Sequence, residues 1–235
     1  MALPKLNSLT YELELPSSGE KLKYRPFLVK EQKALMIAQE SEDDKVIEST
    51  FAQIINDCVA DNVDPYKMPM FDIEYVFLKI RSKSVGEKIT INVLCPDDEK
   101  TRVDVNVDLA EVGIQMKEDH TNVIQLTDKI SMHMRYPTLS DAQGFGSEES
   151  EVSTMFETLK KCVHEIHDGD TIHNKVDMSD KDLDEFLGSM SQNDLEKVTH
   201  FFDTMPKLQH IIKVKNPKTK KVSEVPIEGM QSFFG

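Results

Sequence analysis

One short stretch gathers the side chains that bind transition metals or transfer protons: Cys162, His164, His167, Asp168, Asp170 and His173. A zinc site needs three or four such ligands that converge on one point. On a helix predicted to continue to Ile166, Cys162 and His164 point to different faces, and only His164 and His167 can approach each other. We therefore interpret the stretch as an exposed helix end with a polar turn, and we expect no bound metal.

Catalysis has little support elsewhere in the chain. A metal-assisted hydrolase built on the His164–His173 stretch stays open as an alternative, and it requires bound metal and loss of activity in His167→Ala. Asp180, Asp182 and Asp184 imitate the start of a calcium loop, but the sixth position is not glycine and the segment continues as a predicted helix. Because no nucleophile motif or spaced carboxylate pair accompanies them, we expect no enzyme and no cofactor.

The charge balance argues against two classes of ligand. The chain has 235 residues and a formal net charge of −14. Phosphate contacts require clustered Lys and Arg, and docking on anionic lipid requires basic segments as well. We therefore expect neither nucleic acid nor a membrane as the main partner. The acidity fits solubility, or a partner with a basic surface.

Cysteine usage and the first residues indicate where the protein is made. Three cysteines lie far apart in the sequence, which is no disulfide framework and favours a reducing compartment. Residues 1–5 are not a charged segment followed by an apolar run, so we expect no secretory signal. No apolar stretch approaches the roughly 20 residues that span a bilayer. These features predict a cytosolic protein.

Hydrophobic periodicity predicts the elements that hold these residues. The N-terminal part is expected to form a β-hairpin and three helices, at residues 9–15, 21–25, 30–40, 43–60 and 70–84. The central part is expected to form a hairpin and further strands, at residues 89–95, 103–109, 112–116, 122–126 and 129–135. The rest is expected to contain four helical segments and a closing hairpin, at residues 138–142, 148–166, 179–190, 193–205, 208–215 and 222–227.

The fold class that follows is α+β. It comprises an N-terminal β-hairpin, three helices, a central antiparallel β region, and a helical C-terminal part closed by a β-hairpin. We divide the chain into residues 1–136 and 137–235, with one continuous domain as the alternative and a joint at Gly144–Ser147. The loops that begin Cys95-Pro96 and Asn216-Pro217 indicate two similar hairpins.

Several motifs in order along the chain resemble one protein family. They are Arg25-Pro-Phe27, Lys30-Glu31-x-Lys33, Asp72-Ile-Glu74, Leu78-x-x-Arg81-Ser-Lys-Ser-Val-Gly-Glu87, Cys95-Pro96, Phe202-x-x-x-Pro206-Lys-Leu208 and Gly229-x-x-x-Phe233-Phe234. Together they resemble the baseplate hub assembly proteins of T4-like contractile-tailed bacteriophages. Some relatives carry added cysteines near the two proline loops, suggestive of zinc knuckles. Here Cys95 stands alone and Asn216 occupies the matching place, so we expect no such zinc site.

The resemblance implies a late, non-enzymatic protein of viral tail assembly, either a hub subunit or a chaperone that leaves. Its partners would be other hub proteins, with the tape-measure or central spike protein as further candidates. It would act in the host cytoplasm and could remain in the virion tail baseplate. The alternative is an acidic regulatory protein that binds a basic host protein.

Candidate partner-binding residues come from these motifs and from two local features. The basic spot of Arg81, Lys83 and Lys88 at a helix end either complements the helix dipole or forms a docking corner. The C-terminal aromatic residues either tuck into the core or fill a groove on a partner. The residues we nominate are Arg25, Phe27, Lys30, Arg81, Lys83, Phe233 and Phe234.

Overall fold

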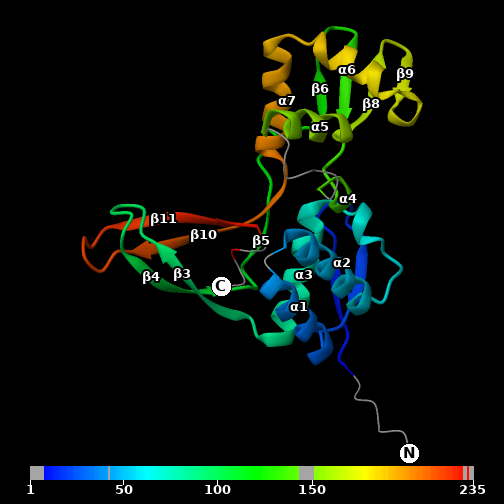
Figure 1. Ribbon diagram of the computed structural model, residues 1–235. Coiled ribbons are helices and arrows are strands. Elements are labelled where there is room, and N and C mark those ends of the chain that lie inside the picture. The colour runs from blue at the N-terminus through cyan, green and yellow to red at the C-terminus, as the bar shows by residue number, and fades with distance from the viewer. Residues whose placement is uncertain (1–7, 42, 143–150, 230–231, 233–235) are drawn as a thin grey trace, which may run out of the picture. The chain divides into compact units, whose positions relative to one another are not determined.

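The computed structural model describes residues 8–41, 43–142, 151–229 and 232 (Figure 1). Its helices are α1 (Val29–Ser41), α2 (Asp44–Cys58), α3 (Met70–Val85), α4 (Leu139–Ala142), α5 (Glu151–Cys162), α6 (Asp180–Gly188) and α7 (Gln192–Thr204), with short 3₁₀ turns η1 (Pro65–Lys67) and η2 (Lys175–Asp177). Its first strands are β1 (Tyr11–Glu14), β2 (Lys21–Tyr24), β3 (Lys88–Leu94), β4 (Arg102–Asp108), β5 (Gly113–Gln115) and β6 (Val123–Gln125). The later ones are β7 (Ile130–Met134), β8 (Val163–Asp168), β9 (Thr171–Asn174), β10 (Lys207–Lys215) and β11 (Val222–Glu228). The α+β class and the opening and closing hairpins are as predicted.

The chain folds into two compact units. Unit 1 comprises residues 1–115 and 207–235, and unit 2 comprises residues 116–206. These boundaries differ from the sequence-based division at 136, because β7 pairs with β8 and β10 pairs with β5, with Leu208 opposite Ile114. The C-terminal hairpin thereby joins the N-terminal segment, a long-range pairing that local patterns do not reveal.

The helical part of unit 1 packs three helices on the first hairpin. Leu13 and Leu22 face each other across β1 and β2 and lie in one buried cluster with α2 and α3. At its centre the rings of Phe51 and Phe77 meet edge to face, with centroids 4.5 Å apart. Gly86 follows α3 with φ +111°, a conformation that a side chain would strain.

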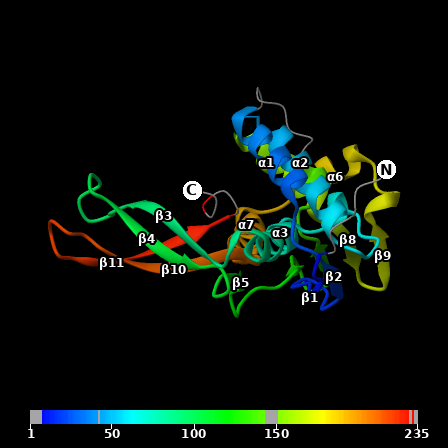
Figure 2. The same cartoon turned by 90° about the horizontal axis from the view of Figure 1, so that it is seen from below.

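Two antiparallel hairpins complete unit 1. Hairpin β3–β4 and the sheet β11–β10–β5 extend together from the helices (Figure 2). Their inner faces form a second core, which includes Ile91, Val107, Ile212 and Val214. Apolar and polar residues alternate strictly in β4 and largely in the other long strands, which turns one face of each hairpin toward this core.

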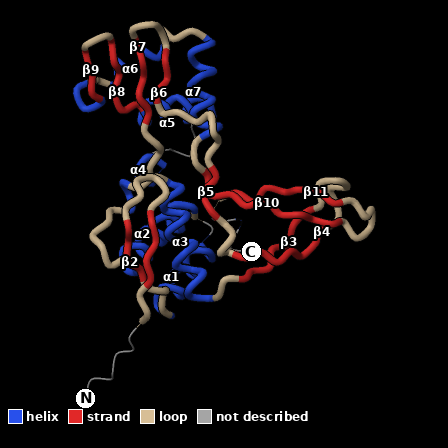
Figure 3. The backbone as a smooth tube through the Cα atoms, turned by 180° about the vertical axis from the view of Figure 1, so that it is seen from behind, coloured by secondary structure: helices blue, strands red, loops and turns tan. Residues whose placement is uncertain are grey.

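Unit 2 is a four-stranded antiparallel sheet with helices on one face. The strand order is β6-β7-β8-β9 (Figure 3). Its core face carries Ile124, Met132 and Ile166, which cluster with Leu183 of α6 and Phe201 of α7. Helices α6 and α7 each begin with a capping box of Ser and Asp.

One element differs from its prediction. The helix expected to continue to Ile166 ends at Cys162, and residues 163–168 form β8. Val163 and Ile166 are buried on β8 and pair with Met134 and Met132 of β7. The spacing of these apolar residues also fits a continuation of α5, and the pairing of residues 163–168 with β7 makes them a strand instead. The polar turn predicted after this helix is correspondingly short, since β8 continues to Asp168 and β9 begins at Thr171.

Two further predictions lie outside the described residues. The joint at Gly144–Ser147 is one, and the placement of Met230, Phe233 and Phe234 is the other. Among the helices that are described, none combines the length and the apolar character needed to cross a membrane.

Candidate functional site

A buried carboxylate fixes the start of α1. Glu31 is 3% exposed, and its Oε1 accepts a hydrogen bond from Arg25 Nη2 at 2.7 Å. Its Oε2 accepts one from the backbone N–H of Leu28 at 2.8 Å. Arg25 also donates to the backbone carbonyl of Asp57 at the end of α2. This arrangement, which we call the Arg25–Glu31 clasp, ties β2, α1 and α2 together.

Opposing effects act on the pKa of Glu31. Burial raises it, but hydrogen bonds from Arg25, the Leu28 N–H and Lys30 outweigh burial and hold the pKa below its ordinary value of 4.5. Glu31 is therefore ionised at neutral pH. Arg25 is its counter-ion inside the protein, whereas the side chain of Lys30 is 65% exposed and remains within reach of a partner.

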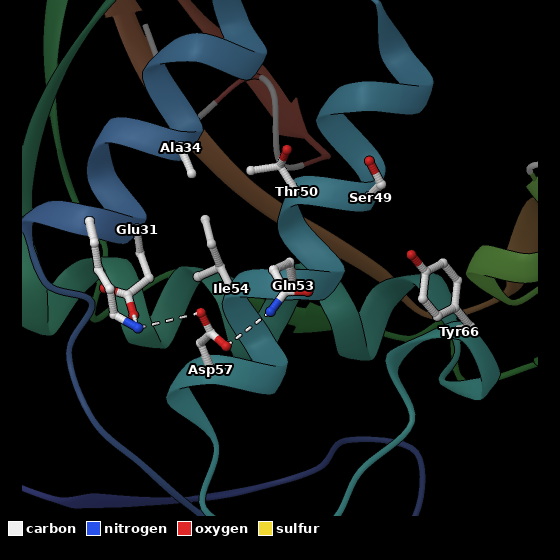
Figure 4. Close-up of a pocket in the computed structure, with 9 residues that line it drawn as sticks. Glu31, Ala34, Ser49, Thr50, Gln53, Ile54, Asp57 and Tyr66 are labelled. Carbon is white, nitrogen blue, oxygen red and sulfur yellow. Dashed lines mark hydrogen bonds and ion pairs between the residues drawn. The ribbon is translucent and has the colours of Figure 1, made fainter.

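A pocket opens beside this clasp, between α1 and α2 (Figure 4). Its volume is about 390 Å³, and its lining residues are Lys30, Glu31, Ala34, Ser49, Thr50, Gln53, Ile54, Asp57 and Tyr66. Asp57 lies at the charged end, 3.6 Å from Lys30 Nζ and 2.9 Å from Gln53 Nε2. The pocket has a polar rim and an apolar wall at Ala34 and Ile54.

Two exposed apolar side chains lie one helical turn beyond residues that line the pocket. Ile37 is 55% exposed and lies one turn beyond Ala34 on α1. Val46 of α2, 39% exposed, precedes Thr50 by one turn on the same row. Together with the pocket, these residues define what we call the α1–α2 groove. It is charged at the Asp57 end and apolar at the Ile37 end.

The other nominated residues of unit 1 lie apart from this groove. Phe27 is buried in the helical core, and its N–H donates to Ser84 Oγ at 2.9 Å. The guanidinium of Arg81 on α3 is half-buried, which lowers its pKa. Lys83 pairs with Glu87 one turn later. Of the nominated set, the structure brings Arg25 and Lys30 together at Glu31.

The predicted likeness of the two proline loops is seen in their backbone. Cys95 N–H donates to Thr101 O at 2.7 Å, and Asn216 N–H donates to Lys221 O at 2.9 Å. The loops also meet, because Asn216 Nδ2 donates to Asp97 Oδ1 at 2.9 Å and Thr219 Oγ1 donates to Asp97 Oδ2. Hydrogen bonds from Thr219 and Asn216 lower the pKa of Asp97. A polar clasp thus joins the hairpin tips.

Asp97→Ala is expected to loosen these tips, because it removes the acceptor of the Thr219 hydroxyl and of the Asn216 amide, and Asn216 is only 1% exposed. Amide hydrogen exchange is expected to accelerate at residues 216–221, and the melting temperature is expected to fall because a buried donor loses its acceptor. Asp104→Ala on the same hairpin is the control. Equal exchange at residues 216–221 in Asp97→Ala and wild type would contradict this role.

Unit 2 contains a second clasp of the same construction. Arg135 follows β7 as Arg25 follows β2, and it binds Asp141, six residues later, through two hydrogen bonds of 2.7 and 3.0 Å. Asp141 accepts from the N–H of Thr138 at 2.8 Å, as Glu31 accepts from Leu28. The N–H of Arg135 donates to Cys162 O, as that of Arg25 donates to Cys58 O. We call this the Arg135–Asp141 clasp.

The stretch nominated for chemistry in unit 2 is spread over two strands. Cys162 is buried at the end of α5, and burial raises the pKa of its thiol to about 12. His164 and His167 lie on β8, where a register shift interrupts the regular alternation. Both approach Glu165, with His164 Nε2 3.6 Å from Oε1 and His167 Nε2 2.9 Å from Oε2. His173 is on β9, opposite Ile166. The two residues lie on a strand and not on the predicted helix, and Glu165 is the group that they share.

The structure instead places His167 beside residues that the sequence did not single out. His133 of β7 stacks on its ring with centroids 3.9 Å apart, and Glu165 Oε2 lies 2.9 Å from His167 Nε2. The separation of His133 from β8 in the sequence hid this grouping. The alternation of His133 with buried Met132 and Met134 is the signal that could have placed it on the open face of a strand.

One family of known proteins matches nearly the whole chain. The matching family model is described as T4 bacteriophage base plate protein, and the match covers residues 8–235. It therefore includes the clasps, the α1–α2 groove and both hairpins. The comparisons with curated proteins and with solved structures gave no match.

Proposed function

Because the chain belongs to the T4 bacteriophage base plate protein family, we propose that it acts in the assembly of the central hub of the phage base plate. Its action is through protein–protein contacts and without catalysis. It works in the host cytoplasm during assembly, as a hub subunit or as a factor that presents hub parts to one another. Its partners are other hub proteins, with the tape-measure and central spike proteins as candidates.

The α1–α2 groove is the observation that carries this proposal. It combines a pocket of about 390 Å³ with exposed apolar side chains at Ile37 and Val46. A helix-in-groove contact needs this combination, an apolar trough with polar groups that fix the orientation. The Arg25–Glu31 clasp holds both helices in place, so the groove exists before the partner arrives.

The charge of the protein favours a basic partner segment. The net charge is −14, and Asp57 at the charged end of the groove is partly exposed. A partner helix with an apolar face and flanking Lys or Arg would place its apolar side chains near Ile37 and its charges near Asp57. Such complementarity favours fast, transient association, which suits an assembly factor.

Ile37→Lys is expected to abolish co-purification of hub proteins from infected cells, because it places a charge in the apolar end of the groove. Ile211→Lys is the matched control, since Ile211 on β10 is 56% exposed and Ile37 is 55% exposed. Unchanged recovery of hub proteins with Ile37→Lys would contradict the proposed surface. Recovery of a basic host protein in place of hub proteins would favour the regulatory alternative.

A further inference from the structure

Three potential metal ligands share one face of the sheet in unit 2. His133 on β7 lies directly opposite Glu165 on β8 in the antiparallel register. His167 lies two positions beyond Glu165 on the same strand, opposite Ser131. Because alternate residues of a strand point to the same side, all three side chains project from one face.

This face is the one that the core does not use. Met132 and Ile166, which alternate with the three ligands, are buried against the helices. The neighbours of the ligands on the open face are accessible, since Ile172 and Asn174 of β9 are exposed. The ligands themselves are half-buried, and the side chains of Glu165 and His167 are 25% and 27% exposed. An ion could therefore reach them from solvent.

The ligand atoms of the three residues already lie close together. One atom from each of His133, Glu165 and His167 lies within 4.8 Å of the other two. Glu165 Oε2 and His167 Nε2 are 2.9 Å apart. The rings of His133 and His167 stack with planes 20° apart. An ion bound at about 2.0–2.1 Å requires ligand atoms roughly 3.3 Å apart, so small rotations of the side chains must adjust these separations.

We propose that His133, Glu165 and His167 bind one divalent transition-metal ion that links β7 to β8 on the open face of unit 2. Two imidazoles and a carboxylate are a ligand set for zinc and its neighbours, whereas calcium and magnesium select oxygen ligands. Three protein ligands leave a coordination position open. A water molecule completes the coordination in the isolated protein.

Calorimetric titration of the full-length protein with zinc chloride tests the site. We expect one zinc ion per chain, and we expect His133→Gln or His167→Gln to weaken binding at least about 100-fold, as loss of a ligand should exceed the 10–100-fold effect of losing an outer partner. His173→Gln is the matched control, because His173 lies on the adjacent strand β9 but belongs to the other face. It is expected to bind zinc as the wild type does.

Two further readouts separate a built site from casual binding by surface histidines. The melting temperatures of the variants without metal show whether each is folded, and zinc is expected to raise the melting temperature of the wild type and of His173→Gln only. Cobalt(II) is expected to give a visible absorption band that both ligand variants lose. Absence of stoichiometric zinc binding, or equal binding by wild type and the folded His133→Gln and His167→Gln variants, would overturn the proposal.

Discussion

Glu31→Ala is expected to lower the free energy of unfolding of unit 1 by about 3 kcal/mol, since removing one partner of a buried ion pair leaves the other uncompensated. In the variant, Arg25 keeps only backbone carbonyls as acceptors, and the N–H of Leu28 loses its acceptor. Urea unfolding followed by circular dichroism measures the change. Glu12→Ala is the control, because Glu12 is exposed and lies 4.0 Å from its nearest cation, Lys23, and no measurable loss is expected there.

The same clasp predicts a pH dependence with a defined sign. The pKa of Glu31 in the folded protein lies below its ordinary value of 4.5. Its contribution is therefore complete above about pH 4.5 and is lost as pH falls through the lowered folded-state pKa. As the pH falls below 5, the free energy of unfolding of the wild type is expected to decrease more steeply than that of Glu31→Ala. Parallel curves for the two proteins would contradict the assignment of Glu31 as an ionised, buried partner.

Asp141→Ala is expected to destabilise unit 2 by a similar amount, about 2–3 kcal/mol. Asp141 is 8% exposed, and its carboxylate accepts two hydrogen bonds from Arg135 and two from Thr138. Burial opposes ionisation, but these bonds outweigh it and lower the pKa of Asp141. The variant leaves the Arg135 guanidinium and the Thr138 N–H without this acceptor.

Hydrogen exchange resolved by residue is the measurement for Asp141→Ala. Faster exchange is expected in β7 and β8, which the clasp connects through the bond from Arg135 N–H to Cys162 O. Asp184→Ala on α6 serves as control, since the side chain of Asp184 is 60% exposed. Wild-type exchange in the strands of Asp141→Ala would show that the clasp does not hold unit 2 together.

Part of the fold could be predicted from sequence because local hydrophobic patterns agree with the tertiary contacts. The opening hairpin, the first three helices and both long hairpins follow from period-2 and period-3.6 patterns that tertiary contacts reinforce. The family motif Arg25-Pro-Phe27 with Lys30-Glu31 also lies on a structural feature, since Arg25 and Glu31 form the clasp. A motif that we interpreted as a partner-binding surface therefore has a structural role: Arg25 and Glu31 hold α1 and α2 beside the α1–α2 groove. Phe27 lies in the hydrophobic core of unit 1.

The parts that could not be predicted depend on contacts between distant segments. The sequence pattern of β8 resembles the end of a helix until its pairing with β7 is known, and the helix prediction therefore missed His133 and Glu165 as neighbours of His167. The unit boundary depends on the pairing of β10 with β5, far apart in the sequence. The α1–α2 groove could not be predicted because single exposed apolar residues are common on protein surfaces, and only the packing of α1 on α2 brings these residues near one another.

Quantitative mass spectrometry of hub intermediates from infected cells, beside purified virions, tests the proposed role most directly. We predict that the protein is present in hub intermediates at a fixed ratio to other hub proteins. Its additional presence in virions would make it a permanent subunit, and its loss from them would make it an assembly factor. Absence from both the intermediates and the virions would contradict a role in building the base plate hub.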